Sequence, residues 1–85
     1  MNEKIDVASL QPGMFVAELD RPWLDTPFLF QGFLIESEDQ IKELRHYCRY
    51  VLVDPLRSIG WDAWRDTPAR KEALRRLELL DRQTQ

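Results

Sequence analysis

The fold prediction rests on residues 5–35, which read IDVASLQPGMFVAELDRPWLDTPFLFQGFLI. Ile5 and Val7 alternate with polar neighbours, which indicates a short strand. The next segment, Gln11-Pro12-Gly13, combines a fixed φ angle with a permissive glycine, as tight turns do. Residues 14–19 alternate again and predict a second strand whose faces are of mixed polarity. The chain therefore begins as strand, turn, strand.

The second part of this segment contains a loop and a strongly apolar run. Residues 20–27 carry two prolines, an arginine and Trp23, a composition that interrupts ladder hydrogen bonds and favours an exposed connection. Residues 28–35 are apolar at nearly every position, as expected of a strand covered on both faces. Gly32 within this run indicates a bulge or a close backbone approach. We expect residues 28–35 to form the central strand.

A capped helix follows the apolar run. Ser37 and Gln40 match a capping box, and three apolar residues then recur at helical spacing on one face: Ile41, Leu44 and Cys48. This pattern predicts a helix from about residue 38 to residue 48. Residues 50–53, YVLV, are apolar on both faces, and the following Asp54-Pro55 ends the pairing, so they predict a second interior strand.

The chain ends on a predicted amphipathic helix. Thr67 is a good cap, Pro68 suits the first helical position, and a stripe follows that consists of Ala69, Ala73, Leu77 and Leu80. The expected fold class is therefore α+β, with a small antiparallel-rich sheet of about four strands in the order β-β-β-α-β along the chain. The pattern leaves the order of the strands within the sheet open.

Length and composition place this pattern in a small domain. Eighty-five residues fit one domain, which we divide into a core at about residues 4–57, a charged connector at 58–66 and a helix at about 67–82. The net charge of −3 argues against a binder of nucleic-acid polymers. One cysteine excludes an internal disulfide, and we expect a cytoplasmic protein. No apolar run approaches the roughly 20 residues of a transmembrane helix.

The spacings of known catalytic and metal sites are missing from the sequence. The single histidine, His46, falls on the Lys42 side of the predicted helix and is expected to be a solvated surface residue. Cys48 shares the helical stripe with Leu44, which predicts a buried structural cysteine. We therefore predict no catalytic, cofactor-binding or metal-binding residue, and no cofactor.

Arginine and tryptophan residues are the candidates for a contact or ligand surface. Arg45 and Arg49 resemble the first half of the motif of PilZ cyclic-di-GMP receptors, although the spacing from Asp54 to Ser58 does not match its second half. A guanidinium group can donate two parallel hydrogen bonds to a phosphate group or to the edge of a guanine base. Tryptophan beside arginine is typical of contact surfaces, but Trp residues in the 58–66 segment could equally pin it to the sheet. The candidates are Arg21, Trp23, Arg45, Arg49, Trp61 and Trp64.

A set of positions in the first two thirds of the chain resembles a known family. These positions are Ile5, Val7, Leu10, Pro12-Gly13-Met14, Val16, Leu19-Asp20, Trp23, Pro27-Phe28, Phe33, Ile35, Ser37, Ile41, Leu44 and Val53-Asp54. They are similar to the N-terminal domain of unknown function that precedes HD-GYP domains, which are bacterial cyclic-di-GMP phosphodiesterases. The resemblance covers roughly residues 4–57 and omits the C-terminal helix.

The resemblance implies a regulatory rather than a catalytic role. Nothing in this chain matches the metal ligands of an HD-GYP domain, so we expect a noncatalytic accessory module rather than an enzyme. Its implied partner is an HD-GYP catalytic domain, in cis or in trans, or another signalling protein. The alternative is a sensor that binds cyclic-di-GMP or another nucleotide. For the C-terminal helix, packing on its own sheet, homodimerisation and a connector role all stay open.

Overall fold

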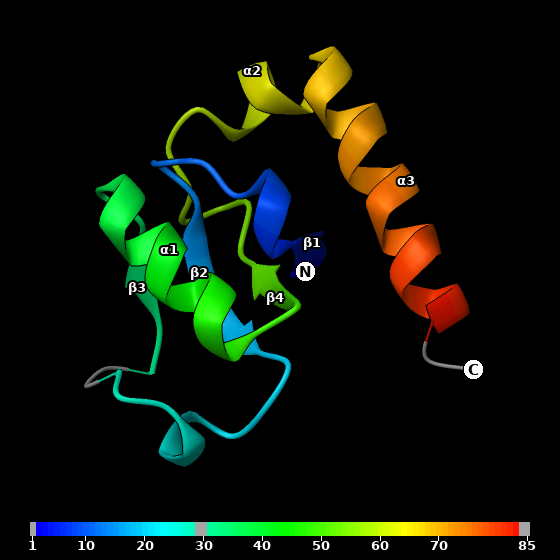
Figure 1. Ribbon diagram of the computed structural model, residues 1–85. Helices are drawn as coiled ribbons and strands as arrows, with labels where there is room; N and C mark the ends of the chain where they lie inside the picture. Colours follow the sequence, from blue (N-terminus) through cyan, green and yellow to red (C-terminus); the bar gives the residue numbers. More distant parts are fainter. Residues whose placement is uncertain (1, 29–30, 84–85) are drawn as a thin grey trace.

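The computed structural model describes residues 2–28 and 31–83 of the chain, as an antiparallel sheet with helices around it (Figure 1). The strands are β1 (Glu3–Asp6), β2 (Phe15–Leu19), β3 (Phe33–Leu34) and β4 (Tyr50–Val53). The α-helices are α1 (Glu38–Tyr47), α2 (Trp61–Arg65) and α3 (Pro68–Gln83), and two 3₁₀ turns, η1 (Val7–Ser9) and η2 (Trp23–Asp25), complete the elements. Within the described residues the sheet has four strands in the order β1-β4-β2-β3. The predicted α+β class, with its C-terminal helix, is confirmed.

The core lies on one face of the sheet, under α1. Ile5 on β1 lies opposite Val51 on β4, and Val16 on β2 lies opposite Val53, so all four side chains point to the same face. All four are almost completely buried. Helix α1 covers them with Ile41 and Leu44, which are equally buried. The predicted capping box opens this helix, where the Gln40 side chain accepts a hydrogen bond from the Ser37 backbone N–H at 3.1 Å.

The expectation that residues 28–35 form the central strand is wrong. Phe33–Leu34 forms the edge strand β3, and Ile35 extends its pairing by hydrogen bonds with Met14 and Gly13, while β4 and β2 are interior; residues 29 and 30 lie outside the described part. The apolar character of this run serves an aromatic cluster instead, in which Phe28 stacks on Phe33 with ring centroids 5.5 Å apart. Gly32 adopts φ +116°, a region that favours glycine, while an added Cβ would lie 3.5 Å from the Phe15 ring, an ordinary van der Waals distance. The backbone conformation, rather than the predicted close approach, therefore accounts for this glycine.

The predicted turn before β2 is present and fixes a neighbouring loop. The Met14 N–H donates to the Gln11 carbonyl at 3.2 Å, and Gly13 adopts φ +99°, a region that favours glycine. The Gly13 carbonyl in turn accepts a hydrogen bond from the Ile59 N–H at 2.6 Å. The turn at Gly13 therefore holds the 54–60 loop that connects β4 to α2.

The segment predicted as a charged connector contains helix α2 and contributes to the core. Trp61 and Trp64 are each only 7% exposed, and their rings lie 5.1 Å apart. Helix α3 then runs alongside the edge strand β1, with Ala73 completely buried. Two ion pairs join α3 to β1, namely Glu3–Arg70 at 2.8 Å and Lys4–Asp81 at 3.3 Å. Of the three roles left open for this helix, the structure therefore supports packing on its own sheet.

Candidate functional site

A groove opens where the C-terminal end of α1, the η1 turn and α3 meet. Figure 1 shows η1 between the two helices, and both helices contact it. The groove has a volume of about 500 Å³, within the range of small-molecule sites. We call it the arginine groove; it is lined by Asp6, Val7, Ala8, Arg45, Cys48, Arg49, Arg76, Leu79 and Leu80. The structure thus brings the two predicted arginines, Arg45 and Arg49, to one concave surface.

The backbone around the arginine groove is held in place by hydrogen bonds. The Arg49 N–H donates to Asp20 Oδ2 at 2.8 Å, and the Arg49 carbonyl accepts from the Val7 N–H at 3.0 Å. Across the groove, Arg76 Nη1 donates to Ser9 Oγ at 3.0 Å and lies 4.0 Å from Asp6 Oδ2. The backbone of Arg49 and the guanidinium group of Arg76 are therefore held by neighbouring elements, and the side chain of Arg49 is exposed.

The charge in this groove is predominantly positive. The exposed side chains of Arg45 and Arg49 make no ion pair with any residue in the described ranges, 2–28 and 31–83. In a chain whose net charge is −3, the lining of the groove holds three guanidinium groups and one carboxylate, that of the buried Asp6, which pairs with Arg76. A second carboxylate, that of Asp20, lies behind the lining, against the Arg49 N–H and Cys48. Such a local excess of positive charge attracts anions despite the overall sign.

Cys48 lies in the wall of the groove as an unreactive thiol. Burial, followed by the nearby Asp20 carboxylate, raises the pKa of Cys48 from 9.0 to about 11. The buried cysteine that the helical stripe predicts is confirmed. His46 is exposed, as expected. A thiol with this pKa is almost entirely protonated near neutral pH and is a poor nucleophile.

The structure places Trp61 and Trp64 inside the protein rather than on a contact surface. The Arg70 guanidinium lies over both indole rings, 5.7 Å from each centroid, and also pairs with Glu3. A cation held between two aromatic faces and a carboxylate stabilises the docking of α2 and α3. Of the two roles that the sequence left open for these tryptophans, the structure supports the packing role.

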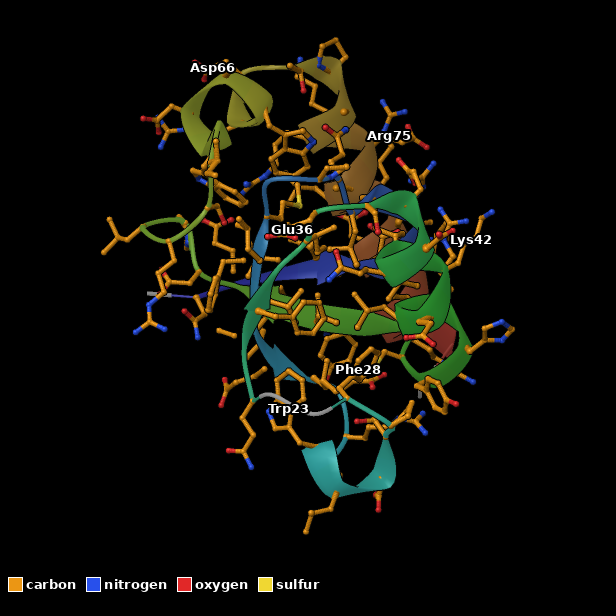
Figure 2. The ribbon with its side chains drawn as sticks, turned by 90° about the vertical axis from the view of Figure 1, so that its left-hand side faces the viewer. Trp23, Phe28, Glu36, Lys42, Asp66 and Arg75 are labelled. Atoms are coloured by element: carbon orange, nitrogen blue, oxygen red, sulfur yellow. The ribbon has the colours of Figure 1, made fainter. Side chains whose placement is uncertain are left out.

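Trp23 and Arg21 lie in the loop after β2, away from Trp61 and Trp64. Figure 2 shows Trp23 and Phe28 side by side at the end of the molecule opposite α2. The Trp23 ring meets Phe28 and Phe33 edge-on, at centroid distances of 6.4 and 6.3 Å. Arg21 is exposed and lies 3.5 Å from Asp20 Oδ1, so the same carboxylate that holds Arg49 also holds Arg21. The six candidates therefore do not form one site.

The structure also has two exposed apolar residues in one loop, which the sequence pattern does not indicate. Leu56 and Ile59, in the 54–60 loop, are 89% and 70% exposed. Leu56 also lines a groove of about 550 Å³, together with Pro55, Trp61 and Arg65 among others. The only signal in the sequence is that two large apolar residues stand in a loop after Asp54-Pro55, and such residues are usually read as minor core. Singly exposed apolar residues are ordinary on a protein surface, and contiguous apolar patches are what mark contact surfaces.

Among residues 2–28 and 31–83, no three His, Cys, Asp or Glu side chains gather closely enough to hold a metal ion. In the same ranges, none of the helices is long and apolar enough to cross a membrane.

The structure is a small α+β domain with one groove lined by arginines and a second groove beside the exposed Leu56. One family model matches residues 2–84, and the chain belongs to that family, which is described as a domain of unknown function, DUF3391. The match extends through α2 and α3, beyond the segment at residues 4–57 that carries the sequence resemblance. No curated protein and no solved structure matches the chain significantly.

Proposed function

We propose that this domain is a noncatalytic accessory module of an HD-GYP-type cyclic-di-GMP phosphodiesterase. It acts in the cytoplasm by contact with the catalytic domain, in cis or in trans, or with another signalling protein. The resemblance at residues 4–57 supports the choice of partner. The observation that carries the contact role is the exposed apolar pair of Leu56 and Ile59 on the 54–60 loop.

This loop is rigid enough to serve as a preformed contact surface. The Ser58 hydroxyl accepts a hydrogen bond from the Phe15 N–H at 2.9 Å and donates one to the Asp54 carbonyl at 2.7 Å. The Leu56 N–H donates to Asp54 Oδ1 at 3.0 Å, and the Ile59 N–H donates to the Gly13 carbonyl. A loop that is already ordered loses little conformational entropy on binding, so its exposed apolar side chains contribute more of their free energy to affinity.

The test is an NMR titration of the labelled domain with an isolated HD-GYP catalytic domain, up to about 1 mM because contacts within one protein are often weak in trans. The wild-type domain should show saturable shifts at the 54–60 loop. A Leu56→Asp, Ile59→Asp double variant should bind at least about tenfold more weakly, since a carboxylate in an apolar contact must be desolvated. The rate of cyclic-di-GMP hydrolysis by the mixture reports whether the contact is regulatory.

Leu24→Asp is the matched control. Leu24 is 94% exposed on η2, at the opposite end of the molecule from α2 in Figure 1. Its substitution should leave the affinity unchanged. Absence of shifts with the wild-type domain, or equal weakening by the Leu24 and the loop variants, would contradict the proposed contact surface.

A second function, a sensor for cyclic-di-GMP or another nucleotide, is favoured by one specific observation. Arg45 and Arg49 face the same groove and lack ion-pair partners within the described residues, so they remain available to phosphate oxygens. Titration of the domain with cyclic-di-GMP, followed by backbone amides and the three Trp indole signals, tests this function. Saturable shifts around Arg45 and Arg49 would support it, and silence at about 1 mM ligand would count against it.

A further inference from the structure

We infer that the arginine groove binds an organic phosphate, and that the bound ligand bridges α1 and α3 through Arg45, Arg49 and Arg76. This inference deepens the second proposed function, because it names a ligand class and a consequence for α3 at the same groove. It does not depend on the contact role of the 54–60 loop, which lies on another surface.

The three arginines converge from separate parts of the chain. Arg45 lies in the last turn of α1 and Arg49 just beyond its end, whereas Arg76 lies on α3 and is held by the Ser9 hydroxyl. A cation in the last turn of a helix is also expected from the helix dipole, which accounts for Arg45 alone. The dipole of α1 does not explain why α3 adds a third guanidinium across the groove.

The lining of the groove specifies the ligand beyond its charge. Leu79, which is 54% exposed, and the partly exposed Leu80 and Val7 form an apolar wall next to the arginines. Guanidinium groups bind phosphate oxygens in a fork and stack on flat rings. A ligand that combines one or two phosphates with an apolar or aromatic body, such as a nucleotide, would contact both the arginines and the apolar wall. The volume of about 500 Å³ suits a molecule of that size.

Binding at this groove has a mechanical consequence for α3. Several of the contacts between α3 and the first nine residues are polar and partly exposed, such as Arg70–Glu3, Arg76–Asp6 and Arg76–Ser9. One partner of each ion pair stays partly solvated, Glu3 at 37% and Arg76 at 40% side-chain exposure, which limits what the pair contributes to stability. A ligand that engages α1 and α3 together adds a contact that exists only when the helix is docked, and it therefore shifts α3 toward the docked state.

The experiment titrates the full chain with ADP, pyrophosphate, adenosine and cyclic-di-GMP and follows backbone and arginine Nε signals by NMR. ADP and pyrophosphate should give saturable shifts at the groove, with adenosine at least about tenfold weaker, because two guanidinium forks are lost with the phosphates. ADP should also slow amide hydrogen exchange in α3. Affinity should fall as salt is raised, since exposed charges are screened.

Arg45→Gln and Arg49→Gln are the principal variants, because neither side chain makes an ion pair within the described residues and the fold should tolerate both changes. Each should weaken ADP binding at least about tenfold, the cost of one charge-assisted contact. Arg57→Gln, at an exposed arginine outside the groove, is the control and should bind like wild type.

The outcomes separate the inference from the sensor function. Binding of ADP and pyrophosphate without cyclic-di-GMP would uphold the groove and reject cyclic-di-GMP as its ligand. Silence of all the phosphates at about 10 mM, or binding that persists unchanged in both glutamine variants, would overturn the inference. Binding without slower exchange in α3 would overturn the bridging role.

Discussion

Replacement of Gly13 by alanine should destabilise the domain far more than the same replacement at Gly60. Both glycines have positive φ angles, +99° and +75°, so a side chain at either position costs about 1–2 kcal/mol of backbone strain. They differ in their surroundings. A Cβ on Gly13 would lie 2.7 Å from the Ile59 carbonyl oxygen, whereas a Cβ on Gly60 would meet nothing within 4 Å.

The magnitude follows from this difference. Overpacking against a backbone group that must shift costs about 1–3 kcal/mol, and this cost arises only in Gly13→Ala. The reduction in unfolded-state entropy on going from glycine to alanine is common to both variants and cancels in the comparison. We therefore expect Gly13→Ala to lower the free energy of unfolding by about 1–3 kcal/mol more than Gly60→Ala does.

Urea denaturation followed by tryptophan fluorescence measures both values, since Trp61 and Trp64 are buried in the folded state. In a domain of this size, each kcal/mol corresponds to about 4–8 °C in melting temperature, so calorimetry gives an independent check. Amide exchange at Ile59 should also become faster in Gly13→Ala, because the 54–60 loop must move. Equal destabilisation by the two alanine variants would refute the close approach at Gly13.

Four further predictions concern the core, the thiol, which has two, and the C-terminal helix. Leu44→Ala should lower the free energy of unfolding by about 2–5 kcal/mol, whereas Lys42→Ala should change it by less than about 0.5 kcal/mol; urea denaturation would contradict this if the two were alike. Cys48 should react with Ellman's reagent at pH 8 about 100-fold more slowly in the folded than in the unfolded chain, because its pKa is raised to about 11. The same raised pKa favours the folded state below pH 9, and this contribution should disappear as the pH rises toward about 11; Cys48→Ala should lose less stability over that range. Ala73→Glu should destabilise the domain by more than about 2 kcal/mol, because Ala73 is completely buried, while Ala63→Glu, at an exposed position, should be nearly neutral by calorimetry.

Local chemistry made much of the fold predictable. The capping box at Ser37, the turn at Gly13 and the interior strand that ends at Asp54-Pro55 are each specified by a few neighbouring residues, and each is present in the structure. The prediction of a central strand at residues 28–35 is wrong because a continuous apolar run has the same sequence pattern in two cases. It fits a strand covered on both faces, and it fits aromatic residues that pack on one another. The position of β3 at the sheet edge depends on that tertiary packing.

The candidate sites were less accessible to sequence reasoning. The spacing of Arg45 and Arg49 indicates a candidate ligand site. Arg76 lies on a helix in which acidic and basic residues are mixed, and such a pattern indicates a solvent-exposed face. Its place beside Ser9 depends on how α3 docks on η1. Likewise, an apolar residue in a loop carries no mark of exposure, so Leu56 could not be distinguished from a minor core residue before the fold was known.

The placement of α3 also protects the domain from self-association through its sheet. One edge of the sheet, β3, is only two residues long, which offers little backbone for an incoming strand. The other edge, β1, is a four-residue strand beside which α3 lies. A chain in which α3 is displaced would present the unpaired N–H and C=O groups of β1 as a template for another strand. We therefore expect a ligand or partner that displaces α3 to promote strand pairing between chains at β1.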